Sequence, residues 1–220
     1  MQSRQMTREE KHDATNLKYF KALERNKLMP ECLGIMRRSE KKLDIRGLGL
    51  GDTYTKAVSW SLKSLGKTLE KVNLTNNRLT SSGANKLISR LNPRVIKHVN
   101  ISENHLGPQA FDTINPLLQN SPWMSKLVLE KCSLGLRSIE LICKGLEENI
   151  SVLHLNLAKN NISDNAAVFI ANMITANKHM KALDLNDNNL RGNGGSLIFT
   201  QLKVNKCILE LDLSWNSIGG

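Results

Sequence analysis

Glycines, histidines and cysteines are the residues of this chain whose spacing could indicate chemistry. Gly47, Gly49 and Gly51 superficially look like a glycine-rich phosphate loop. Their spacing is not G-x-G-x-x-G, and no lysine–serine pair follows them as it does in a P-loop. We therefore interpret these glycines as turn residues.

The histidines and cysteines do not form a recognisable reactive site. His98 and His154 occupy the same position of a repeated string, two repeats apart, so strand spacing places them roughly 10 Å from each other, too far to share a metal ion. The four cysteines have neither metal-ligand spacing nor a framework of pairs, which favours a reducing compartment. No Ser/His/Asp or Cys/His arrangement is recognisable. The sequence therefore predicts no catalytic residue, no metal site and no cofactor.

An eleven-residue string recurs along the chain and must position whatever surface is functional. Its pattern is L-x-x-L-x-L-x-x-N-x-L, with Cys132 once in the asparagine position, and successive copies begin 27 or 28 residues apart. The copies begin at Leu69, Ile96, Met124, Val152, Met180 and Ile208. A fixed period of this length is typical of a solenoid, in which each unit buries its apolar face against its neighbours.

Each repeat divides into a strand and a helix. Alternating aliphatic residues, such as Leu155 and Leu157, predict a short strand with one buried face. A small residue 14 positions after each start, and aliphatic residues 18 and 22 positions after it, predict one inward helix face. Pro116 predicts a short or kinked helix. The asparagine column is expected to satisfy buried turn backbone: Asn77, Asn104, Asn160, Asn188 and Asn216.

The pattern resembles the leucine-rich repeat, and its period and helical second half resemble the ribonuclease-inhibitor-type subfamily. The resemblance covers roughly residues 40–220. It implies an α/β solenoid shaped as a curved horseshoe, with parallel strands on the concave face and helices on the convex face. The first repeat is degenerate, because Leu48 takes the asparagine position. The seventh is incomplete at Gly220, so we expect either a longer array or another chain to cover Leu211 and Leu213.

The N-terminal segment is expected to differ from the repeats. Residues 1–12 are polar and predict a mobile tail. Residues 13–39 predict a helical N-terminal cap, in which Asp13 caps a helix carrying Leu17, Phe20 and Leu23 on one face. Residues 40–220 form the repeat array.

Charge supplies the main functional clue. The net charge of +11 is concentrated in residues 1–130, which carry +10, whereas residues 131–220 carry +1. This excess favours an acidic partner; nucleic acid, an acidic protein surface or an anionic membrane would all satisfy it. The third string position is basic in the first five repeats, then neutral, then acidic: Lys42, Lys71, His98, Lys126, His154, Ala182 and Glu210.

Two interpretations of this third position remain open. The residues are either ordinary solvated strand positions or a stripe that orients an elongated partner. We include Arg46 and Trp215 among the candidate binding residues. Trp215 is either an interface residue or packs against a further repeat. Trp60 and Trp123 are expected to be core or packing residues.

The functional expectation is a non-enzymatic protein–protein interaction scaffold in the cytoplasm. No signal peptide or long apolar run points to secretion or a membrane span. The resemblance to leucine-rich repeat proteins of the cytoskeleton and cilium implies a ciliary or microtubule-associated assembly, with tubulin or another axonemal protein as the acidic partner. The alternative is a GTPase-activating regulator similar to the Ran-activating members, although the acidic tail of those proteins is missing. Nucleic-acid binding is a third candidate, but aromatic content is only 4%.

Overall fold

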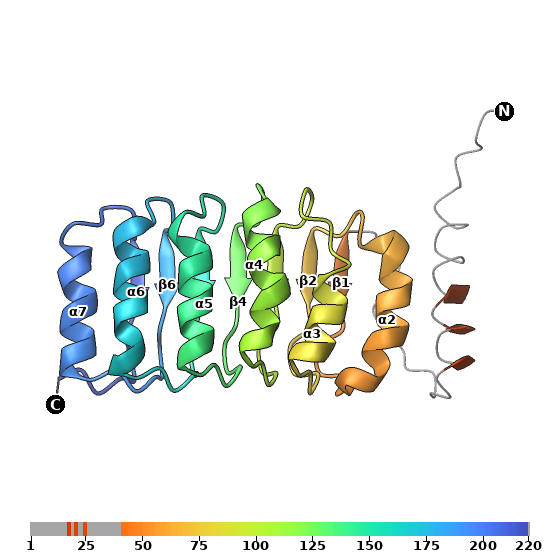
Figure 1. Ribbon diagram of the computed structural model, residues 1–220, viewed down its shortest axis with the longest axis horizontal. Coiled ribbons are helices and arrows are strands. Elements are labelled where there is room, and N and C mark those ends of the chain that lie inside the picture. The colour runs from red at the N-terminus through yellow and green to blue at the C-terminus, as the bar shows by residue number, and fades with distance from the viewer. Residues whose placement is uncertain (1–16, 19, 22–23, 26–40, 220) are drawn as a thin grey trace.

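The computed structural model describes residues 17–18, 20–21, 24–25 and 41–219. The predicted tail lies outside these residues, and so does most of the predicted cap. In the described part, strands and helices alternate along the chain (Figure 1). The strands are β1 (Lys42–Asp44), β2 (Lys71–Asn73), β3 (His98–Asn100), β4 (Lys126–Val128), β5 (His154–Asn156), β6 (Ala182–Asp184) and β7 (Glu210–Asp212).

The strands form one parallel sheet in chain order, from β1 to β7. The register pairs equivalent string positions, as in Leu127 with Leu155 and Leu155 with Leu183. In β1 to β6 the middle residue of each strand is buried while its two neighbours are not. The sheet is open, and the row of repeats does not close on itself (Figure 1). The predicted α/β solenoid is therefore confirmed.

The helices cover one face of the sheet (Figure 1). They are α2 (Gly51–Leu65), α3 (Ser81–Ile88), the 3-10 helix η2 (Pro108–Ala110), α4 (Phe111–Asn120), α5 (Leu136–Glu147), α6 (Asp164–Ala176) and α7 (Gly192–Leu202). Pro116 lies inside α4, which has ten residues and begins through η2. A proline in this position removes one backbone donor from the helix. The predicted shortening is not observed, because α4 is longer than the eight-residue α3.

The core lies between the strands and the helices. Leu155 and Leu157 of the fifth strand region are buried, as are Ile170 and Ile174 of α6. The small residue at each helix start is also buried, because the preceding repeat approaches it closely. A β-carbon on Gly83 would overlap the carboxylate of Asp52. These positions confirm the predicted inward helix face.

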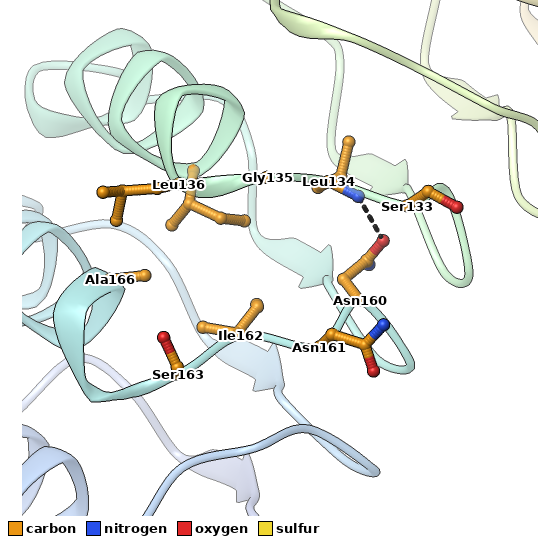
Figure 2. A pocket seen from close by; sticks show the side chains of 10 residues that line it. Ser133, Leu134, Gly135, Leu136, Asn160, Asn161, Ile162, Ser163 and Ala166 are labelled. Carbon is orange, nitrogen blue, oxygen red and sulfur yellow. Dashed lines mark hydrogen bonds between the residues drawn. The ribbon is translucent and has the colours of Figure 1, made fainter.

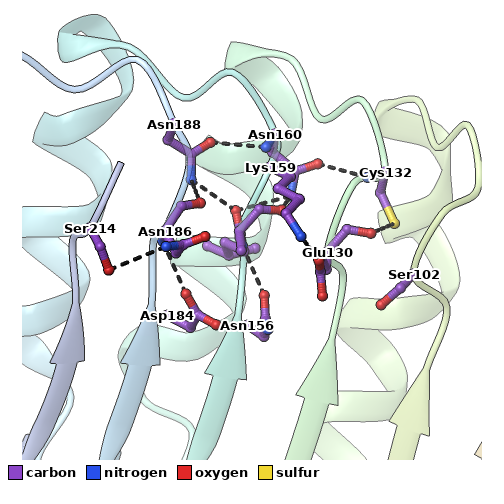
Figure 3. Close-up of polar contacts among 12 residues, drawn as sticks. Ser102, Glu130, Cys132, Asn156, Lys159, Asn160, Asp184, Asn186, Asn188 and Ser214 are labelled. Atoms are coloured by element: carbon purple, nitrogen blue, oxygen red, sulfur yellow. Dashed lines mark hydrogen bonds and ion pairs between the residues drawn. The ribbon is translucent and has the colours of Figure 1, made fainter. Parts of the chain in front are cut away.

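The asparagine column forms the predicted ladder at the end of the strands (Figure 3). The Asn160 amide nitrogen donates to the carbonyls of Leu129, Leu157 and Ala158 at 2.8, 3.0 and 3.0 Å. Its side-chain oxygen accepts from the backbone N–H of Cys132 at 2.9 Å. Each ladder side chain thus closes its own turn and binds the repeat before it.

A second asparagine ladder lies at the opposite end of the strands, and the sequence analysis missed it. Asn177 donates to the carbonyls of Leu146 and Asn149 at 2.7 and 2.9 Å. Its side-chain oxygen accepts from the backbone N–H of Met180 at 2.8 Å. Asn205 repeats this arrangement one unit later and donates to the Asn177 carbonyl at 2.9 Å. Together with Asn149, which donates to the Leu118 carbonyl at 3.0 Å, these residues precede β5, β6 and β7, so these three strands have ladder side chains at both ends.

The degenerate first repeat begins without the ladder, as expected. Gly47, Gly49 and Gly51 have positive φ angles of 72°, 59° and 60°, which supports their interpretation as turn residues. Leu48 is 38% exposed and supplies no ladder group. The buried side-chain oxygen of Asn77 has no hydrogen-bond partner in the described part of the chain. The ladder therefore starts at Asn77.

The expectation that Trp60 and Trp123 are core residues is wrong. Their exposed fractions are 46% and 64%. The Trp60 ring lies on the outer surface of α2, with the Arg25 guanidinium 5.4 Å and the Lys63 ammonium 5.1 Å from its centroid. Cation–π contacts of this kind stabilise an exposed indole without burying it.

Candidate protein-binding surface

The third string position becomes the first residue of every strand, and the sheet register places these residues side by side. Lys71 pairs with His98, His98 with Lys126, and Lys126 with His154. Neighbouring strands are about 4.8 Å apart, so each side chain lies next to the one from the adjacent repeat. We call the set Lys42, Lys71, His98, Lys126 and His154 the cationic column. The structure therefore brings together five of the seven predicted binding residues.

The members of the column differ in how their charge is compensated. The Lys42 ammonium lies 3.4 Å from the Asp44 carboxylate. Lys71 and Lys126 are exposed, and neither forms an ion pair with an acidic side chain in the described part of the chain. These two lysines are consequently available to a partner's carboxylates.

The pKa of His98 is affected by its position in the column. Its side chain is half-buried between the two lysines. Burial lowers the pKa of His98, and the charges of Lys71 and Lys126 lower it further. The neighbouring His154 and Lys97 act in the same direction. The two lysines thus add an electrostatic cost to the protonation of His98, beyond the larger cost of its burial.

The last residue of each strand forms a second, mostly polar column. Asn73 accepts from the backbone N–H of Thr75 at 3.1 Å, and Asn100 accepts in the same way from Ser102 at 2.9 Å. Side chains in this arrangement stabilise the turn after a strand. The full column reads Asp44, Asn73, Asn100, Val128, Asn156, Asp184 and Asp212. The polar strand face therefore has a structural role in addition to any binding role.

The face changes sign along the array, as the sequence predicts. Beyond His154 the first strand residues are Ala182 and Glu210, and the last are Asp184 and Asp212. The Asn156 amide donates to the Asp184 carboxylate at 2.9 Å (Figure 3). The basic end covers β1 to β5, and the acidic end covers β6 and β7.

Arg46 and Trp215 lie outside the cationic column. The Arg46 guanidinium is 3.4 Å from Asp44, just after β1. Trp215 follows β7, adopts a positive φ of 55° and is 82% exposed. The distance along the sheet separates Trp215 from the cationic residues, so these predicted residues do not form a single site.

A three-residue ion-pair cluster flanks the column and was missed by the sequence analysis. The Glu70 carboxylate lies 2.8 Å from both the Lys41 and the Lys97 ammonium groups. Hydrogen bonds from these lysines lower the pKa of Glu70 to about 2. The three residues occupy the second string position of successive repeats. The sequence pattern that could have predicted this cluster is an acidic residue between two basic residues, each one repeat apart.

One surface hollow lacks the charged residues that mark the strand face. It measures about 250 Å³, opens between the loops of two successive repeats and is lined by Leu134, Ile139, Ile162 and Ala166, among others (Figure 2). None of its lining residues is charged. Across the described residues, no group of three or more His, Cys, Asp or Glu side chains could hold a metal ion.

Comparison with known proteins supports the repeat architecture. A family model described as Leucine Rich repeat matches residues 67–87, 148–171, 176–199 and 204–220. No curated protein matches the chain. Among solved structures, Leiomodin-1 Actin-Binding Site 2 (ABS2) is similar over 50% of this chain and 64% of that chain, with 26% identity and a TM-score of 0.45. The chain thus covers less than two thirds of that structure.

No helix among the described residues is long and apolar enough to cross a membrane. Four matched repeats coincide with strand–helix units that stack in one parallel sheet. Residues 41–219 therefore form a leucine-rich repeat solenoid, in which the family model matches four repeats.

Proposed function

We propose that this protein is a non-enzymatic interaction scaffold that binds an acidic protein through its strand face. The observation that carries the proposal is the pair of exposed lysines, Lys71 and Lys126, which have no acidic partner in the described residues. Lys71 stands on β2 and Lys126 on β4, and each of these strands is paired with a neighbouring strand on both sides. Fixed charges lose little conformational freedom beyond their own side chains when a partner binds.

Leucine-rich repeat proteins serve as protein-interaction scaffolds, and we assign this chain to the ribonuclease-inhibitor-type subfamily. The 28-residue period and the helix in each repeat from α3 to α7 support this assignment. We further propose a cytoplasmic role in a ciliary or microtubule-associated assembly, with tubulin or another axonemal protein as partner. The basic half of the strand face supports an acidic partner of this kind.

Partner capture with charge-reversed variants tests the scaffold function. The Lys71→Glu/Lys126→Glu variant reverses the two unpaired lysines. The Lys67→Glu/Lys203→Glu control makes the same change in net charge at exposed positions outside the strands. A photo-reactive cross-linker placed at Asn100 should attach to a specific protein in cell extract. We expect the strand-face variant to reduce this product at least tenfold and the control to retain it.

The same variants can be used to test the proposed microtubule-associated role. Wild-type protein should co-sediment with microtubules, and the strand-face variant should remain in the supernatant. Actin filaments serve as a second acidic polymer in a parallel sedimentation. Equal capture by wild type and the strand-face variant would argue against the strand face as the binding surface. Loss of microtubule binding alone would remove only the ciliary and microtubule assignment.

A further inference from the structure

The cationic part of the strand face has a defined length. Lys71, His98, Lys126 and His154 stand on four consecutive strands, β2 to β5, and we call these four the cationic patch. On the same four strands the last residues are uncharged, namely Asn73, Asn100, Val128 and Asn156. Acidic residues border the patch at Asp44 on β1 and at Asp184 on β6. A ligand that matches this surface needs negative charge over four strands and no farther.

The spacing of the patch distinguishes between partner conformations. At about 4.8 Å per strand, the three steps from Lys71 to His154 span about 14 Å. Residues i, i+3, i+7 and i+10 on one side of an α-helix span about 15 Å at 1.5 Å per residue. Four residues on one side of an extended strand need about 20 Å, because they are about 6.6 Å apart. The helix keeps a carboxylate opposite each patch residue, which is either a lysine ammonium or a histidine ring that can donate an N–H, whereas the extended segment loses the register.

From this match we infer that the partner presents an acidic α-helix, which lies across β2 to β5 with carboxylates at i, i+3, i+7 and i+10. The inference rests on the proposed function and adds the shape and charge pattern of the partner. Val128 refines it, because this half-buried residue is the one aliphatic member of its column. An aliphatic residue of the helix, between two carboxylates, packs over Val128.

The charge gradient also orients the helix. A helix N-terminus carries partial positive charge and its C-terminus partial negative charge. Asp184, Glu210 and Asp212 lie beyond one end of the patch, and Lys42 and Arg46 lie beyond the other. The favourable orientation therefore places the helix N-terminus over β6 and β7.

Two synthetic peptides of identical composition test the inference. The first is an alanine- and lysine-based helix with glutamates at i, i+3, i+7 and i+10. The second has the same residues, but its glutamates alternate at i, i+2, i+4 and i+6. Binding to the full chain is measured by fluorescence anisotropy at low ionic strength. We expect the first peptide to bind at least tenfold more tightly than the second.

Variants of the protein locate the binding. Lys71→Glu/Lys126→Glu should abolish binding of the first peptide, and Lys71→Gln/Lys126→Gln should weaken it to an intermediate extent. Lys67→Glu/Lys203→Glu should leave it unchanged. Circular dichroism confirms that each variant is folded, as expected for substitutions of exposed side chains.

The other possible results of these titrations would contradict different parts of the proposal: the helical partner, the location of its site, or the class of ligand. The two peptides could bind equally well, and the strand-face variant could bind neither. This result would contradict the inference that the partner is helical, but it would still support an acidic partner on the strand face. Retained binding of the first peptide by that variant would place its site elsewhere. A single-stranded oligonucleotide that binds more tightly than the first peptide, and competes with it, would make the patch a phosphate-binding surface instead.

Discussion

The side-chain oxygen of Asn188 accepts a 2.9 Å hydrogen bond from the backbone N–H of Asn160, one repeat earlier in the chain (Figure 3). The same oxygen accepts from the Ile162 backbone N–H at 2.9 Å. Each turn is therefore completed by a side chain from the next repeat. Stability in a solenoid comes largely from such nearest-neighbour interfaces, so the ladder couples repeats that would otherwise open independently.

Substitution of a central ladder residue should strongly destabilise the array. Asn160→Ala removes donors to three carbonyls and the acceptor for the backbone N–H groups of Cys132 and Leu134. Buried groups left without a partner cost about 1–3 kcal/mol each, and partial relaxation makes a total loss of about 3 kcal/mol reasonable. Urea denaturation measures it. Asn165→Ala, an exposed first-turn substitution in α6, is the control and should change stability by less than about 0.5 kcal/mol.

Restoring the interrupted ladder should stabilise the protein. Cys132 donates its thiol to the Ile101 carbonyl at 3.3 Å, at the position where the neighbouring repeats place an asparagine amide. Burial raises the pKa of this thiol to about 12, so the sulfur stays a neutral, weak acceptor. Cys132→Asn provides an amide oxygen instead and should add about 1 kcal/mol to the free energy of unfolding. A lower denaturation midpoint for Cys132→Asn than for Cys132→Ala would contradict this account.

The sequence predicts those features that depend on the repeat period. The strands, the inward helix face and the first ladder follow from residues at fixed offsets within one unit. The second ladder is equally periodic, since Asn149, Asn177 and Asn205 are 28 residues apart, but it lies before the eleven-residue string and so outside the pattern that defines the repeat. Trp60 could not be placed in this way, because its exposure depends on side chains from outside its own helix. The ion pairs of Glu70 required the strand register.

Close approach of two repeats should make Gly83 sensitive to substitution. Asp52 accepts a 3.0 Å hydrogen bond from the Thr80 backbone N–H, and its carboxylate occupies the space of a β-carbon on Gly83. Gly83→Ala should therefore cost about 2 kcal/mol, within the range for overpacking, despite the higher helix propensity of alanine. Thermal denaturation of Gly83→Ala, Asp52→Ser and the double variant forms a mutant cycle. If the serine relieves the overlap, the double variant will be more stable than additivity predicts.

The cationic column should make stability depend on pH near neutrality. The pKa of His98 is lowered from 6.5 in the folded protein, first by burial and then by Lys71 and Lys126. The unfolded chain therefore takes up this proton at higher pH than the folded chain. The resulting contribution to stability is complete above pH 6.5 and is lost as the pH falls toward the pKa of the folded state.

Urea denaturation between pH 5 and 7.5 detects this effect. His98→Gln should flatten part of the decline in unfolding free energy on the acidic side. His179→Gln, outside the column, provides the comparison. An unchanged difference between pH 5 and 7.5 in His98→Gln would show that folding does not lower the pKa of His98.

The ion-pair cluster beside the patch should limit its affinity for acidic ligands. Glu70 remains ionised because the Lys41 and Lys97 hydrogen bonds lower its pKa to about 2. Glu70→Gln removes this anion and leaves the charge of both lysines uncompensated next to Lys71, so it should strengthen binding of the i, i+3, i+7, i+10 peptide by about three- to tenfold at low salt. The gain should shrink as salt screens the exposed charges.

Glu140→Gln is the matched control for this change. Glu140 also bridges two basic residues, Arg137 at 2.6 Å and Lys144 at 2.9 Å, but it lies on α5. Helix α5 belongs to the helical face, so the control raises the net charge equally without altering the strand face. Anisotropy titrations at two salt concentrations compare the variants. Equal gains in both would mean that peptide affinity follows overall charge, whereas a gain confined to Glu70→Gln assigns the attraction to the strands.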